Sequence, residues 1–180
     1  MAWRIRNMTH TAIAVRDIDV GEELTLTYID AAGTRAERQE KLRAWGFNCT
    51  CRQCLMDESE AQESDSRLGQ IKQTILDLDA GPDGPVTAET GGYLVSLYEK
   101  ERLHIYLGHA YTRAALNYAL FADEAMARKY ATKAIESLEI EFGQSKDMAS
   151  MRKLAANPRG HWAWGLQAAR RHTAGKIPVR

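Results

Sequence analysis

The sequence predicts an α+β protein in which a short β-rich part at the N-terminus precedes a longer all-α part. Between residues 3 and 28, apolar side chains recur at every second position, as in strands, whereas beyond residue 67 they follow the helical period. All three cysteines of the 180-residue chain lie between these parts, in the stretch WGFNCTCRQC. We therefore divide the chain into a β-rich segment (1–34), a helix with a cysteine segment (35–56), a linker (57–66) and a helical region (67–175).

Composition and charge exclude several classes of function. Lysine and arginine together number 24, as do aspartate and glutamate, so the net charge is zero and no binding to nucleic acid or to an anionic membrane is expected. No apolar run approaches the roughly 18 residues that cross a bilayer, and the first residues, MAWRIRNMTH, lack the apolar core of a secretory signal. We expect an intracellular monomer in the nucleus, the cytoplasm or both.

The β-rich segment contains two stretches with strand character. Residues 3–15 alternate in period two, and a turn follows around Gly21. In the next stretch, ELTLTY, the side chains of Leu24, Leu26 and Tyr28 fall on one face of a strand. This pattern predicts that Tyr28 points toward a core.

A short helix should connect this segment to the cysteines. Thr34 and Glu37 have the spacing of a capping box, and Gly46 is placed to end the helix that they begin. The acidic stretch after the cysteines, LMDESEAQESDS, shows no periodicity and is interpreted as the linker.

The remaining sequence shows the stripes of several amphipathic helices. A first helix precedes AGPDGP, a second begins near Thr87, a third covers about 101–121, a fourth is capped by Asp123, and a last pair flanks Asn157 and Pro158. The small and aromatic residues of the third and fourth helices resemble one helical hairpin of a tetratricopeptide repeat. Their spacing also suits a ligand groove, although helix packing explains it better.

The cysteine spacing predicts a zinc site. Cys49, Cys51 and Cys54 place three thiolates on one loop, and an odd number of clustered cysteines in a reducing compartment favours metal binding over disulfides. Three buried, inert thiols are the alternative. A closed zinc site takes four ligands, and His10 is a weak candidate for the fourth because a single strand histidine is more often structural.

Two stretches together carry a resemblance to a known family. VRDIDVGEELTLTYID, then a short helix, then WGFNCTCRQC resembles the C-terminal end of a SET domain with its cysteine-rich post-SET segment. The order is similar to that in the fungal branch of the SET and MYND-like protein-lysine methyltransferases, whose post-SET segment precedes a tetratricopeptide-like helical region. The resemblance is specific over residues 9–54 and looser beyond.

The resemblance implies a role for six residues. Tyr28 matches the catalytic tyrosine, at the point where the methyl group of S-adenosylmethionine meets the lysine amine. Phe47 matches the aromatic residue that stacks on the adenine of this cofactor, and Trp45 matches an aromatic residue of the lysine channel. The zinc ligands of the family are matched by three residues: Cys49, Cys51 and Cys54. A core tyrosine is the alternative for Tyr28, and a solvated turn is the better interpretation of the neighbouring carboxylates Glu22 and Glu23.

Two motifs of the family do not occur in this sequence. They are a Gly-x-Gly cofactor loop and an Asn-His-Ser-Cys motif, whose cysteine supplies the fourth zinc ligand. We therefore expect the C-terminal part of a larger enzyme, inactive by itself, with a protein substrate that is either a histone or a nonhistone protein. Two alternatives stay open: a noncatalytic helical interaction module with a structural cysteine loop, and a zinc-stabilised helical protein unrelated to SET domains.

Overall fold

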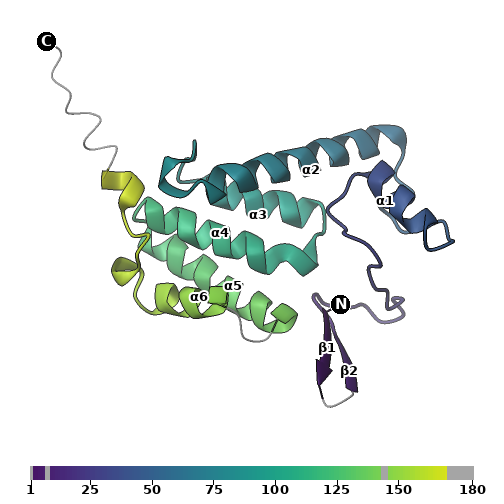
Figure 1. Ribbon diagram of the computed structural model, residues 1–180, viewed down its shortest axis with the longest axis horizontal. Coiled ribbons are helices and arrows are strands. Elements are labelled where there is room, and N and C mark those ends of the chain that lie inside the picture. The colour runs from purple at the N-terminus through teal and green to yellow at the C-terminus, as the bar shows by residue number, and fades with distance from the viewer. Residues whose placement is uncertain (1, 7–8, 143–145, 170–180) are drawn as a thin grey trace, which may run out of the picture.

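The computed structural model describes residues 2–6, 9–142 and 146–169. An array of helices forms the body of the protein, and a β-hairpin and a short helix lie to one side of it (Figure 1). The strands are β1 (Ala2–Arg6) and β2 (Thr9–Ile13). The α-helices are α1 (Arg35–Arg43), α2 (Glu58–Asp79), α3 (Thr90–Lys100), α4 (Leu107–Leu120), α5 (Glu124–Phe142) and α6 (Lys146–Ala156).

The β-structure is smaller than the sequence suggests. β1 and β2 pair in antiparallel register with Ala2 opposite Ile13, and they are the only strands among the described residues. The strand expected over ELTLTY is wrong, because residues 22–27 have no regular structure. Tyr28 is 57% exposed and does not point into a core. A period-two pattern forms a strand only where a neighbour completes its hydrogen-bond ladder, and no described residue provides one here.

The main hydrophobic core of the described residues lies within the helical region. Successive helices pack against one another from α2 to α6, and they bury side chains such as Leu94 and Leu138. Gly91 brings α3 close to α4, since a Cβ atom at this position would lie only 2.6 Å from the Cα of Ala114. The predicted stripe of Leu68, Ile71, Ile75 and Leu78 is confirmed as the inner face of α2.

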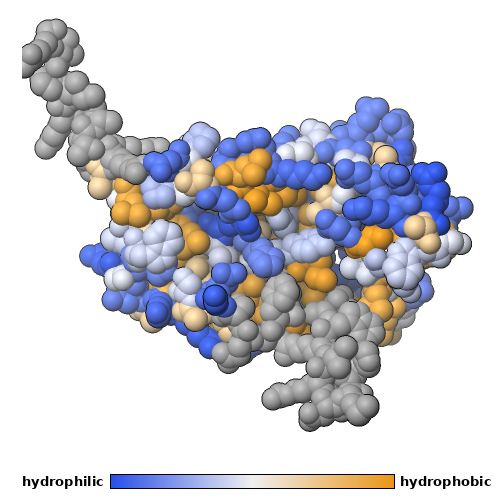
Figure 2. All heavy atoms as spheres, in the orientation of Figure 1, coloured by the Kyte–Doolittle hydropathy of each residue, from blue (hydrophilic) through white to orange (hydrophobic). Residues whose placement is uncertain are grey.

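The linker predicted over residues 57–66 is wrong. Asp57 caps α2 by accepting a hydrogen bond from the N–H of Glu60 at 2.8 Å, and the side chain of Glu60 completes a capping box. The acidic stretch is therefore the first part of a long helix. Hydrophilic residues cover α1 and this part of α2 on the face shown in Figure 2. The apolar stripe is absent here because only Ala61 and Ser64 face inward.

The helix expected over about 101–121 is interrupted at its start. Glu101 caps the end of α3, Arg102 adopts a positive φ of 55°, and a 3₁₀ turn over His104–Tyr106 precedes α4. Leu103 is buried in this connection, and burying it stabilises the break.

The tyrosines of the helical region serve packing rather than an open groove. Tyr111 and Tyr118 are 8% and 9% exposed, and the ring of Tyr118 stacks on that of Tyr130 with centroids 5.5 Å apart. This supports the packing interpretation. The tetratricopeptide-like arrangement remains a prediction. None of the helices in the described ranges combines the length and the apolar character needed to span a bilayer.

Candidate functional site

Three aromatic side chains that the sequence singled out lie together. The ring centroid of Tyr28 is 5.7 Å from that of Trp45 and 5.7 Å from that of Phe47, with interplanar angles of 57° and 72°. Such tilted and edge-to-face arrangements are favourable for aromatic pairs. Tyr28 thus forms one aromatic cluster with two residues that follow it by 17 and 19 positions.

The end of α1 positions two members of this cluster. The N–H of Trp45 donates to the carbonyl of Leu42 at 2.9 Å, and Gly46 then turns the chain with a φ of 79°. A glycine adopts this left-handed conformation without steric cost, and the turn lets Phe47 as well as Trp45 reach the ring of Tyr28. All three rings are between 40% and 62% exposed, so the cluster is open to a ligand.

The three cysteines also come together, as their spacing predicts. The Sγ atoms of Cys49, Cys51 and Cys54 all lie within 4.8 Å of one another. Zinc–thiolate bonds of about 2.3 Å in a tetrahedron place sulfur atoms roughly 3.8 Å apart, so a small contraction would seat an ion on this trio. The carbonyl of Cys51 holds the loop closed by accepting from the N–H groups of Cys54 and Leu55 at 2.9 and 3.0 Å. The side chain of His10 lies outside the described part of the chain.

The thiols differ in their acidity. Burial acts to raise the pKa of Cys51, but the backbone N–H of Cys54 and the adjacent thiols outweigh it, and the pKa falls below its usual value. Burial, together with hydrogen bonds that the Cys54 thiol donates to the sulfur atoms of Cys51 and Cys49, raises the pKa of Cys54 to about 12. Several thiolates at this spacing repel one another, and a bound dication would remove this repulsion.

Polar contacts attach this part of the chain to the helical region. The hydroxyl of Tyr106 donates to Asp30 Oδ1 at 2.9 Å, and the Arg35 guanidinium donates to the carbonyl of Met56 at 2.7 Å. In the cysteine loop, Gln53 Nε2 donates to the backbone carbonyl of Glu101 at 2.7 Å. The site is therefore held against the start of α2 and the end of α3.

Two buried charged residues in this region were not anticipated. Arg38 on α1 is 5% exposed and donates to the carbonyls of Gly33 and Gln53. Glu101 is 2% exposed and accepts from the hydroxyl of Ser64 at 2.5 Å and from the guanidinium of Arg67. Arg38 and Leu42 are four positions apart and share one face of α1, and this spacing was the available signal that Arg38 is buried. No local pattern distinguishes Glu101 as a buried residue.

The neighbouring carboxylates Glu22 and Glu23 do not form a catalytic pair. Glu22 forms an ion pair with Arg16 and accepts from the N–H of Asp19 at 3.2 Å. The Arg16 contact and this N–H lower the pKa of Glu22 to about 2. Glu22 is therefore a turn residue, in agreement with the sequence interpretation.

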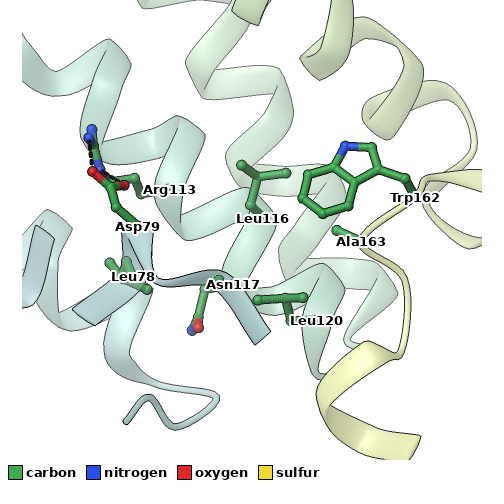
Figure 3. Close-up of a pocket in the computed structure, with 9 residues that line it drawn as sticks. Leu78, Asp79, Arg113, Leu116, Asn117, Leu120, Trp162 and Ala163 are labelled. Carbon is green, nitrogen blue, oxygen red and sulfur yellow. Dashed lines mark hydrogen bonds and ion pairs between the residues drawn. The ribbon is translucent and has the colours of Figure 1, made fainter. Parts of the chain in front are cut away.

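A separate pocket of about 170 Å³ lies at the far end of α2 (Figure 3). Asp79 and Arg113 form a two-bond ion pair at one side, with both distances 2.8 Å, and the indole of Trp162 lies at the other. Asn117 turns its amide toward the loop before α3 and donates to the carbonyls of Thr87 and Ala88. The length of α2, roughly 30 Å, separates this pocket from the cysteines.

Comparison with known proteins gives several partial matches. The chain is 42% identical over 69 residues to the histone-lysine N-methyltransferase SET5 of Candida albicans, and this match covers 37% of the chain and 15% of SET5. It is 41% identical over 71 residues to set5 of Schizosaccharomyces pombe, covering 38% and 22%. It is 47% identical over 49 residues to human SMYD3, covering 28% and 12%. Neither a family model nor a solved structure matches the chain.

These matches confirm the resemblance to SET-family methyltransferases over part of the chain. The matched segments span less than a quarter of each of these relatives. The matched relatives include human and plant proteins as well as fungal ones, so a specifically fungal origin of this chain stays a prediction. The relatives support lysine methyltransferase activity at the level of the family.

Proposed function

We propose that this chain, similar over a quarter to a third of its length to SET5 and SMYD3 histone-lysine methyltransferases, forms the C-terminal end of the active site of a protein-lysine N-methyltransferase. The observation that carries the proposal is the joint placement of Tyr28, Trp45 and Phe47 directly before a cluster of three cysteines. The resemblance assigns these same residues to one site, although up to 26 positions separate them in sequence.

Each aromatic residue has a distinct role in this proposal. S-adenosylmethionine would supply the methyl group, and Phe47 would stack on its adenine. Tyr28 would direct its hydroxyl toward the sulfonium methyl group and hold it in line with the lysine nitrogen. Trp45 would line the lysine channel, where an aromatic wall contacts the alkyl chain, desolvates the ammonium and lowers its pKa.

The cysteine loop would hold these aromatic residues in place. Zinc bound by Cys49, Cys51 and Cys54 would fix the loop that carries Phe47 at its start, and the Sγ spacing supports this donor set. A fourth ligand is not supplied by the cysteines of this chain. We further propose that the chain acts on a protein, histone or nonhistone, in the nucleus or the cytoplasm.

Methyl transfer needs cofactor contacts that this sequence does not contain. The Gly-x-Gly loop and the Asn-His-Ser-Cys motif are absent, so we propose that the 180-residue chain is inactive by itself. Transfer of radiolabelled methyl from S-adenosylmethionine to histones by the purified chain would contradict this.

A chimeric enzyme tests the catalytic proposal directly. The segment of Schizosaccharomyces pombe set5 that matches this chain would be replaced by the corresponding residues of the chain, and methyl transfer to histones would be measured. We expect activity, and a loss of roughly 100-fold on Tyr28→Phe, because the hydroxyl that positions the methyl group is removed. The control variant Glu40→Gln changes an exposed residue on α1 and should retain full activity. A folded, active chimera that is indifferent to Tyr28→Phe would refute the assigned role.

A noncatalytic interaction module is the second candidate. Its support is that the buried core comes from α2 to α6 and the loop after α6, so the helical region has a complete core of its own. In this case the cysteine loop would be structural. A chimera that folds and binds zinc but transfers no methyl group would favour this candidate.

A further inference from the structure

The buried guanidinium of Arg38 lies next to the cysteine loop. We propose that Arg38 is a positioning residue for the metal site: it fixes the loop through the carbonyl of Gln53 and compensates the negative charge of the metal-bound thiolates. This inference rests on the proposed zinc site. It goes further by assigning a role to a residue outside the ligand set.

The first observation is that Arg38 is a buried cation with no acidic partner within residues 2–6, 9–142 and 146–169. It is 5% exposed, and among the described residues no carboxylate lies within 4.0 Å of its guanidinium. The buried Glu101, in contrast, is paired with Arg67. Burying a cation is costly unless it is paired and hydrogen-bonded, so a compensating negative charge is expected nearby.

The second observation is the set of groups that Arg38 does contact. Nη1 donates to the carbonyl of Gly33 at 2.5 Å and Nη2 to that of Gln53 at 3.4 Å. Gln53 lies between Cys51 and Cys54, and its side chain reaches the carbonyl of Glu101. The guanidinium thus joins the start of α1 to the middle of the metal-binding loop. A planar, forked guanidinium presents a separate nitrogen to each carbonyl, whereas a lysine must reach both from a single nitrogen.

The charge of the site completes the argument. A zinc ion with three thiolates carries a net negative charge, and a thiolate as fourth ligand would increase it. Groups around the ligands commonly tune a metal site, and their loss weakens metal binding. Because Arg38 is hydrogen-bonded to Gln53, the residue before Cys54, its positive charge would stabilise the metal-bound thiolates. The same hydrogen bond would hold the loop in the conformation that brings the three sulfur atoms together.

Zinc affinity of the 180-residue chain tests this role. Affinity would be measured by competition with a chromophoric chelator for the unaltered chain, Arg38→Met, Arg38→Lys and the control Arg43→Met, which removes an exposed arginine from the same helix. We expect Arg38→Met to weaken zinc binding roughly 10- to 100-fold, Arg38→Lys to recover part of the loss by restoring the charge, and Arg43→Met to have no effect. Equal affinities for Arg38→Met and the unaltered chain would overturn the proposal.

Amide hydrogen exchange separates this inference from the zinc proposal. In metal-free protein, Arg38→Met should accelerate exchange of the Cys54 and Leu55 amides, which donate to the Cys51 carbonyl. The amides of α4 report whether the helical region stays folded. If the unaltered chain bound no zinc, the zinc proposal would fail, while accelerated exchange would still support positioning of the loop. Unchanged exchange of the Cys54 and Leu55 amides in Arg38→Met would refute the positioning role of Arg38.

Discussion

Removing the buried carboxylate of Glu101 should destabilise the junction between α2 and α3. The carboxylate is 2% exposed and accepts two hydrogen bonds, one from Ser64 and one from the cation of Arg67. Hydrogen bonds to charged groups contribute about 1.5–3 kcal/mol each, and removing the carboxylate also removes the cost of burying it. Arg67 keeps a second contact with Glu63 and remains partly exposed, so it is not left isolated. We expect Glu101→Ala to lower the free energy of unfolding by about 2–4 kcal/mol.

Urea and thermal unfolding followed by far-ultraviolet circular dichroism would measure this change. For a chain of this size, about 2–4 kcal/mol corresponds to a decrease in melting temperature of roughly 4–16 °C. Glu99→Ala, an exposed residue on the same helix, is the control and should change stability by less than about 0.5 kcal/mol. A double-mutant cycle of Glu101→Ala and Arg67→Ala should give a coupling energy of at least about 1 kcal/mol. Coupling below about 0.3 kcal/mol would refute the reasoning, because it would mean that the ion pair contributes nothing.

Three further changes test other contacts. Tyr106→Phe should cost about 1 kcal/mol of unfolding free energy. The N–H of Ala32 and the Tyr106 hydroxyl lower the pKa of Asp30, so in the unaltered protein the stability contributed by the Tyr106–Asp30 hydrogen bond should be lost as pH falls through the lowered pKa of Asp30. Burial and Asp30 raise the pKa of Tyr106 to about 12, so the Tyr106 hydroxyl should lose its proton only at strongly alkaline pH. A pH titration of stability that is identical for the two proteins would argue against this contact. Gly91→Val should cost about 1–3 kcal/mol in urea unfolding because a Cβ would approach α4 to 2.6 Å, and unchanged stability would show that the helices can separate freely. Leu94→Ala, at a fully buried position, should lower the melting temperature through a loss of about 2–5 kcal/mol, whereas a loss below 1 kcal/mol would place Leu94 outside the core.

Much of the helical region and of the candidate site could be predicted from local patterns. The capping box of Thr34 and Glu37, the end of α1 near Gly46 and the buried stripe of α2 are all confirmed. Short spacing is also why the cysteines could be grouped in advance, since residues two and three positions apart on one loop are always near one another. The resemblance added the three aromatic residues, which no periodicity would have joined.

Each of the failures has a physical cause. The period-two pattern around Tyr28 indicates a strand only if a partner strand is present, and the acidic start of α2 shows no apolar stripe because it buries only two small residues. For the strand the deciding contact is nonlocal, whereas the start of α2 has a local signal, the capping box of Asp57 and Glu60, which the missing apolar stripe obscured.

Sequence alone determined the capping box of α1, the buried stripe of α2 and the clustering of the three cysteines, because these features depend on residues a few positions apart. Only the tertiary structure decided that Arg38 is buried without a carboxylate beside it in the described part of the chain, that Glu101 joins α2 to α3, and that the aromatic cluster is open to solvent. These features depend on backbone carbonyls and side chains brought together from segments up to about 50 residues apart. Hydrogen bonds over such separations leave no periodic signal, and a charged residue in a buried position looks, in the sequence, like any charged residue at the surface.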